Sequence, residues 1–325
     1  MRIKVIGFAL CALLFALVNG SAPARAADKI PRVGILFIGG KDQPHLESFK
    51  QGLRELGYTE GKNITLVYRY AEGKQERLAD LAAELIGEKI DVMVTTAAIS
   101  ALAVRRITRT LPIVMTTGNP LEEGLAASLA KPGGNVTGLS VMASDMSVKR
   151  LELLKESFPK RTRVAALWSP REREAVTGFK ETEEAAKALS LRLHPLEIKS
   201  VDDIDRAFIA ITKARDNALV VILSPLATLN SKRIVELALK HRLPGIYPTR
   251  QFVEEGGLMA YGPLIGDLYR RAATYVDKIL KGRTPADLPV EQPMKFDFIV
   301  NLKAAKQIGV TVPPNVLVRA DRVIR

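Results

Sequence analysis

Short apolar segments alternate with amphipathic segments along most of this chain. Residues 32–38 form an apolar run rich in β-formers, and Phe49, Leu53 and Leu56 then recur at the spacing of one helix face. Gly57 follows this stripe where a helix should end. The alternation continues through expected strands at 63–70, 91–95 and 112–115 and expected helices at 78–85 and 97–109. This order predicts β-α-β units and a parallel sheet covered on both faces.

The same pattern then starts again. The expected strands lie at 163–168, 191–196, 218–223 and 245–247, and the expected helices at 178–189, 201–213 and 226–240. Two successive α/β series in one chain predict two doubly wound, parallel-sheet lobes of Rossmann-like type.

The C-terminal part is too small to form a third lobe. It contains one long amphipathic helix from Leu264 to Ile279, a strand at 295–300 and a short helix at 302–308. These elements must complete the two lobes, so we expect a hinge of several crossing segments that lets the lobes close on a ligand. The expected boundaries are a leader at 1–26, a first lobe at 27–139 plus 263–290, and a second lobe at 140–262 plus 291–325.

The first 26 residues have the order of a secretory signal peptide. Arg2 and Lys4 precede an apolar run at 5–18, and Ala24-Arg25-Ala26 has the small-x-small pattern of a cleavage site. The apolar run is shorter than the roughly 20 residues that span a bilayer. We therefore expect a cleaved, exported protein that is free in the periplasm and not inserted stably in a membrane. Cys11, the only cysteine, lies in this leader, so the mature part has no thiol nucleophile.

The charge does not indicate a nucleic-acid partner. The formal net charge of +13 becomes +10 once the three basic residues of the leader, Arg2, Lys4 and Arg25, are removed. The remaining basic residues are scattered, and no basic groove interleaved with aromatic residues is present. This distribution indicates a solvated basic surface.

The chain lacks the motifs of common enzymes. His45, His194 and His241 lie far apart without metal-ligand spacing, and neither a GxSxG, an HExxH nor a phosphate loop is present. We predict a protein that is not an enzyme, with no catalytic residue, no metal and no cofactor.

Candidate binding residues gather where the expected strands end. Thr95-Thr96, Asn119-Pro120, Ser169-Pro170 and Ser224-Pro225 each combine a helix-capping residue type with a following helix start. The carboxyl edge of a parallel sheet is where ligands bind in open α/β folds, and helix N-termini attract carboxylates. The structural alternative is that these residues are only caps.

A further candidate group follows the expected strand at 258–260. Tyr261 offers an apolar face with a hydroxyl, and Gly262 permits close approach of the backbone. Asp267 either binds a ligand ammonium group or pairs with Arg271 one helical turn later. The full set of predicted ligand-binding residues is Phe37, Gly39, Thr95, Thr96, Ala97, Asn119, Pro120, Ser169, Ser224, Pro225, Tyr261, Gly262 and Asp267.

Several longer segments resemble a known family. They are FKQGLRELGY at 49–58, KPGGNVTG at 131–138, FVEEGGLMAYG at 252–262, LYRRAA at 268–273, ILKG at 279–282 and DLPVEQP at 287–293. Together they resemble the ABC-transporter substrate-binding protein family, in the branch with tryptophan- and tyrosine-binding members. The resemblance implies a type I periplasmic-binding fold, a ligand held between two lobes, and a membrane permease with its ATPase as partners.

The chain departs from this family's pattern at two strand ends. Thr95-Thr96-Ala97-Ala98 stands where a Gly-Thr-Pro-like turn is common, and Leu223-Ser224-Pro225-Leu226 lacks the acidic residue often found there. The expected ligand is therefore described only as amino-acid-like, or as another carboxylate or aromatic solute. We expect a monomeric solute-binding component of an importer. A ligand-sensing module for a membrane receptor, or an exported α/β hydrolase or transferase, are the alternatives.

Overall fold

The computed structural model describes residues 29–42, 44–116, 119–141 and 143–325. The predicted leader at 1–26, with its cleavage pattern and Cys11, lies outside the described residues. Among the residues described, no helix combines the length and the apolar character needed to cross a membrane.

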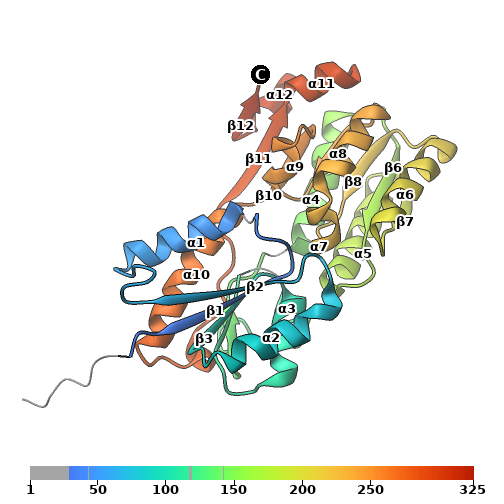
Figure 1. Ribbon diagram of the computed structural model, residues 1–325. Coiled ribbons are helices and arrows are strands. Elements are labelled where there is room, and N and C mark those ends of the chain that lie inside the picture. Colours follow the sequence, from blue (N-terminus) through green and yellow to red (C-terminus); the bar gives the residue numbers. More distant parts are fainter. Residues whose placement is uncertain (1–28, 43, 117–118, 142) are drawn as a thin grey trace, which may run out of the picture. The chain divides into compact units, whose positions relative to one another are not determined.

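In the described chain the first lobe is built on a five-stranded parallel sheet with the order β2-β1-β3-β4-β5 (Figure 1). Its strands are β1 (Arg32–Phe37), β2 (Thr65–Tyr70), β3 (Val92–Thr95), β4 (Ile113–Met115) and β5 (Val136–Gly138). Its helices are α1 (Pro44–Glu55), α2 (Leu78–Gly87), α3 (Ala98–Ile107) and α10 (Ile265–Leu280).

Alternation along the strands explains how both faces of this sheet are covered. Val33, Ile35 and Phe37 of β1 pack in one core cluster with residues of α1 and α10. Leu36 points the other way and packs in a second cluster with residues of α2 and α3. Helix α10 thus joins the first lobe although it follows most of the second lobe in sequence.

The second lobe contains, within the described residues, a seven-stranded sheet with the order β12-β11-β10-β9-β8-β6-β7. Its strands are β6 (Arg163–Trp168), β7 (Arg192–Glu197), β8 (Ala218–Val221), β9 (Gly245–Tyr247), β10 (Met259–Pro263), β11 (Phe296–Asn301) and β12 (Arg322–Ile324). Its helices are α4 (Ala143–Ser157), α5 (Arg173–Ala188), α6 (Val201–Ala214), α7 (Pro225–Leu229), α8 (Ser231–Lys240), α9 (Arg250–Glu254), α11 (Leu302–Ile308) and α12 (Pro314–Val318).

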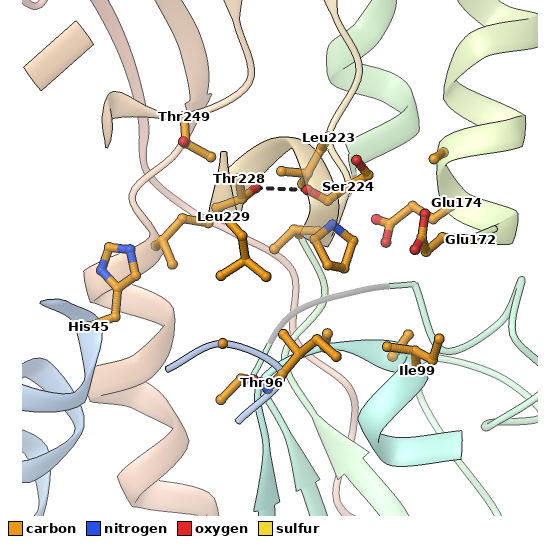
Figure 2. Close-up of a pocket in the computed structure, with 18 of the residues that line it drawn as sticks. His45, Thr96, Ile99, Glu172, Glu174, Leu223, Ser224, Thr228, Leu229 and Thr249 are labelled. Carbon is orange, nitrogen blue, oxygen red and sulfur yellow. Dashed lines mark hydrogen bonds between the residues drawn. The ribbon is translucent and has the colours of Figure 1, made fainter. Parts of the chain in front are cut away.

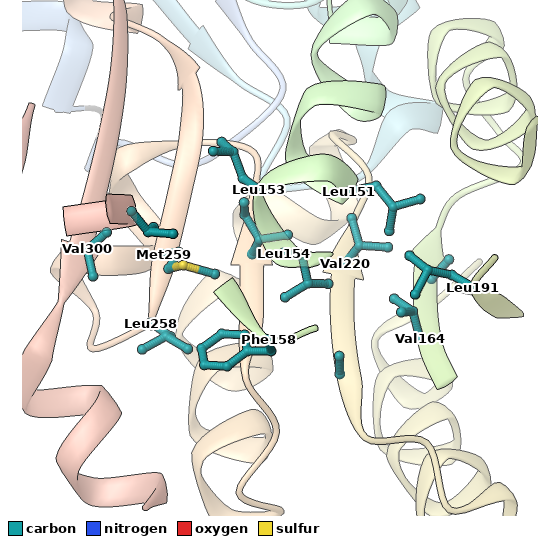
Figure 3. Close-up of a cluster of buried hydrophobic side chains, with 14 of the residues drawn as sticks. Leu151, Leu153, Leu154, Phe158, Val164, Leu191, Val220, Leu258, Met259 and Val300 are labelled. Carbon is teal, nitrogen blue, oxygen red and sulfur yellow. The ribbon is translucent and has the colours of Figure 1, made fainter. Parts of the chain in front are cut away.

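The core of the second lobe is dominated by aliphatic residues. Leu151 and Leu154 of α4, together with Phe158 directly after this helix, pack over Val164 and Val220 of the sheet (Figure 3). The opposite face of the sheet forms another buried cluster with α6, α8 and α9. Burial of apolar surface on both faces stabilises each lobe without a disulfide.

Two details differ from the sequence-based expectation. Strand β11 runs antiparallel to β10, so the second sheet is mixed at one end. The single helix expected at 226–240 is divided into α7 and α8, because Asn230 leaves helical geometry at φ −114° and ψ 23°. The predicted architecture of two doubly wound α/β lobes is nevertheless confirmed.

The described chain passes between the two sheets after β5, after β10 and before β11. The first and third of these segments lie side by side, because the Ser140 amide donates to the Glu291 carbonyl at 2.9 Å and the Glu291 amide donates to the Gly138 carbonyl at 3.0 Å. Such paired crossing strands are a suitable hinge.

Candidate functional site

A cavity of about 430 Å³ lies at the carboxyl ends of strands from both lobes. Its walls are formed by the segments that follow β1, β3, β6, β8 and β9, together with the start of α10 (Figure 2). This is the edge at which α/β folds bind ligands, because loops and helix N-termini converge there.

Five of the predicted binding residues line this cavity, namely Gly39, Thr96, Ala97, Ser224 and Pro225. Ser224 caps α7, since its Oγ accepts a hydrogen bond from the Ala227 amide at 3.2 Å and Pro225 occupies the first helical position. The start of α7 therefore forms part of the cavity wall.

Thr96 connects three elements around the cavity. Its Oγ1 accepts a hydrogen bond from the Ile38 amide at 3.3 Å, and it also interacts with the hydroxyl of Tyr269 on α10. Burial raises the pKa of Tyr269 to about 12, so this hydroxyl stays protonated at neutral pH. Thr96 thereby fixes the loop after β1 and the start of α3 relative to α10.

Helix α3 begins beside the cavity without a side-chain cap. Its N-cap residue is Ala97, which has no hydrogen-bonding side chain. The first turn of an α-helix carries unsatisfied amide donors and the positive end of the helix dipole. This turn can therefore receive the carboxylate of a ligand.

The other predicted residues, Phe37, Thr95, Asn119, Pro120, Ser169, Tyr261, Gly262 and Asp267, are not among the residues that line the cavity. Some of them have structural partners. Phe37 stacks on Tyr70 at 5.3 Å between ring centroids, and Ser169 Oγ accepts from the Arg171 amide at 3.3 Å. Asp267 lies 3.8 Å from Arg271, the pair that their spacing predicts.

Several lining residues were missed by sequence reasoning. Glu172 is the N-cap residue of α5 and Glu174 lies in the first turn of this helix, a few residues after the predicted Ser169-Pro170 pair. Glu123 and Thr249 also line the cavity. Glu172 Oε1 accepts a hydrogen bond from Gln75 Nε2 of the first lobe at 3.0 Å. Burial raises the pKa of Glu172 above its ordinary value. The signal that could have found these glutamates is their position at the start of α5.

His45 also lines the cavity, a position that the sequence did not indicate. Its ring lies 5.4 Å from that of Tyr269, and burial lowers its pKa. His45 is therefore neutral at pH 7. Within the described part of the chain, no three His, Cys, Asp or Glu side chains are grouped so as to hold a metal ion.

Comparison with known proteins shows the family of the whole chain. Residues 42–324 match the model of a family described as ABC transporter substrate binding protein. The chain belongs to this family. The predicted resemblance is confirmed. The protein is a substrate-binding protein and not an enzyme; it binds a small molecule and works with an ABC transporter.

Individual relatives agree with this assignment. A tyrosine-binding protein of Clostridioides difficile is 26% identical over 272 residues, covering 82% of this chain and 78% of the relative. A structure of a conserved domain protein from Vibrio cholerae has a TM-score of 0.85 at 28% identity, covering 91% of this chain and all of that one. A Streptococcus structure of an ABC domain in complex with L-Trp has a TM-score of 0.83 at 26% identity, covering 90% of this chain and 99% of that one. The chain therefore has the type I periplasmic-binding fold.

Proposed function

We propose that this chain is the periplasmic solute-binding component of an ABC importer. It is exported through a cleaved leader and works as a monomer. It binds a small amino-acid-like, carboxylate or aromatic solute between its lobes and delivers it to a membrane permease driven by an ATPase. The observation that carries this proposal is the cavity lined by strand-end segments of both lobes in a chain that belongs to the substrate-binding family.

The geometry above supports the proposed site. The uncapped first turn of α3, beside Thr96 and Ala97, receives the carboxylate end of the solute. Ser224 and Pro225 contribute from the opposing lobe. The domain boundaries proposed from the sequence place the hinge at the segments near 139–140, 263 and 290–291.

Closure on the solute tests the proposal as a whole. The solute should be identified by mass spectrometry of small molecules that copurify with the mature protein, followed by a thermal-shift screen of amino acids and related carboxylates. Because the solute binds both lobes at once, it should shift the population toward a closed state. Small-angle scattering should show compaction at saturating solute. A protein that binds no small molecule and does not compact would not be an importer component of this kind.

Thr96→Ala tests where the carboxylate lies. A hydrogen bond to a charged group contributes about 1.5–3 kcal/mol, so the variant should bind the identified solute about 10-fold more weakly or worse. Thr96→Ser keeps the hydroxyl and should bind nearly as the original protein does. Thr110→Ala, on an exposed residue outside the cavity, is the second control. Unchanged affinity of Thr96→Ala by calorimetry would place the carboxylate elsewhere.

A further inference from the structure

The charged residues around the cavity are divided between its rim and its interior. Lys41, Asp42, Glu72 and Arg171 are exposed, and their two positive and two negative charges cancel. The partly buried titratable residues are different in kind: Glu123, Glu172 and Glu174 are carboxylates, and His45 is neutral because burial lowers its pKa. The interior of the described cavity thus has an excess of negative charge in a chain whose formal net charge is +13.

Burying a carboxylate costs free energy unless a cation or hydrogen-bond donors compensate it. Glu172 is only partly compensated within the protein, by Gln75, Ser169 and the neighbouring Arg171. Its Oε1 accepts from Gln75 at 3.0 Å, whereas its buried Oε2 meets no donor in hydrogen-bond geometry among the described residues. Burial accordingly raises the pKa of Glu172. Arg150 interacts electrostatically with Glu174 but does not line the cavity, and its Nε donates to the Tyr261 carbonyl at 2.8 Å.

A second, independent observation lies elsewhere in the same cavity. Thr249, in the loop after β9, is only 8% exposed, and its Oγ1 has no hydrogen-bond partner among the described residues. A buried hydroxyl without a partner is costly and indicates a ligand atom that pairs with it. Figure 2 shows Thr249 and the glutamates Glu172 and Glu174 on opposite sides of Leu223 and Ser224, so a ligand that reaches both is elongated.

The cavity offers little to an aromatic ligand. Among its described lining residues, Tyr269 carries the single benzene ring, and that ring is already packed against His45. Between the polar ends the walls are aliphatic, with Ile99, Leu223 and Leu229. Such walls suit a flexible aliphatic stem that connects two polar groups.

We propose that this cleft selects an elongated organic cation, whose ammonium or guanidinium group is bound by Glu172 and Glu174 and whose stem lies along the aliphatic wall toward Thr249. The inference rests on the proposed function and gives the substrate class of the same site. It distinguishes this chain from relatives named for tyrosine or solved with L-Trp. Glu172 and Glu174 thus supply acidic groups that the neutral segment at 223–226 lacks.

Matched pairs of solutes test this selection directly by calorimetry. Lysine is compared with norleucine, which lacks the terminal ammonium group, and arginine with citrulline, in which a neutral urea group replaces the guanidinium group. Putrescine, tyrosine and tryptophan complete the panel. Because of the charge-assisted contact, whichever of lysine and arginine binds more tightly should bind about 10- to 100-fold tighter than its neutral counterpart. It should also bind tighter than tyrosine or tryptophan.

Two variants locate the selectivity. Glu172→Gln and Glu174→Gln keep the shape of each side chain and remove its charge. Each should lower the affinity for the cation about 10-fold or more while leaving the affinity for norleucine or citrulline unchanged. Glu183→Gln is the matched control, since Glu183 lies on the same helix, is 49% exposed and is outside the cavity. Its binding should not change.

The outcomes separate this inference from the function on which it rests. The inference is overturned if norleucine and citrulline bind as tightly as lysine and arginine, or if tyrosine or tryptophan binds tighter than every cation. If the protein still compacts with such a solute, the proposed function stands. A protein that binds no solute in any class overturns both. If a variant fails to fold, the ratio between lysine and norleucine in the unmodified protein still decides.

Discussion

Replacing Gly52 with alanine should lower the free energy of unfolding by about 2–3 kcal/mol, because the new methyl group has no room. Gly52 lies on α1, where a Cβ atom would be 2.3 Å from the Arg270 carbonyl oxygen and 2.8 Å from the Ala273 Cβ. Both neighbours belong to α10, and a backbone carbonyl cannot swing aside as a long side chain can. The two helices would have to separate, which would open the core cluster beneath them. Chemical denaturation of the mature protein measures the loss.

Gly87→Ala is the matched control for this prediction. Gly87 is also helical, at the end of α2, but a Cβ atom there would meet nothing within 4 Å. Alanine favours helix over glycine by about 0.5–1 kcal/mol, so this variant should be slightly more stable than the original protein. Changes of opposite sign in the free energy of unfolding for the two variants would show that α1 packs closely on α10. Equal effects would contradict that packing.

Local sequence pattern predicted α1 well but could not predict its partner. The stripe identified Phe49 and Leu53, which are buried, and Gly57 ends the helix region with φ +88°. Leu56 was expected on the same stripe, but α1 ends at Glu55 and Leu56 is 37% exposed. The close contact at Gly52 involves a residue 218 positions later. No periodicity within α1 contains that information, because it depends on how the chain returns to the first lobe.

The candidate site shows the same division between local and long-range information. Capping chemistry predicted Ser224 and Pro225 as a helix start, and both line the cavity. The position of Glu172 at the start of α5 is a local signal, but its burial depends on the cavity wall and on Gln75 from the other lobe. Thr249 is similar, since an unpartnered hydroxyl becomes visible only when the surrounding residues are in place. Sequence pattern therefore indicated the edge of the sheets at which the cavity lies, and only part of the side chains that line it.

Arg150→Ala should be among the most destabilising substitutions in the second lobe, with an expected loss of about 3–5 kcal/mol. Arg150 on α4 is fully buried and is one of the largest side chains with no exposure. Truncation would leave a cavity nearly as large as the side chain. It would also leave the Tyr261 carbonyl on β10 without the hydrogen bond that Arg150 Nε donates to it. That carbonyl lies just before the chain crosses to α10, so the damage should extend to the hinge. Denaturation of the variant measures the loss, and a near-neutral result would contradict the packing.

Arg150→Met separates the contribution of volume from that of charge. Methionine fills much of the space without a charge, and burial of the guanidinium opposes its stabilising contacts. Burial lowers the pKa of Arg150 to about 9, which means that the unfolded chain holds this proton more tightly than the folded one. Below pH 9 the guanidinium is charged in both the folded and the unfolded state, so the free-energy cost of burying it does not change with pH. Above pH 9 the folded side chain loses its proton first, so the stability of the original protein should rise relative to Arg150→Met. The difference in the free energy of unfolding between the two proteins is measured from pH 7 to 10.5. A constant difference would show that Arg150 keeps its ordinary pKa, and that its contacts outweigh the cost of burying it.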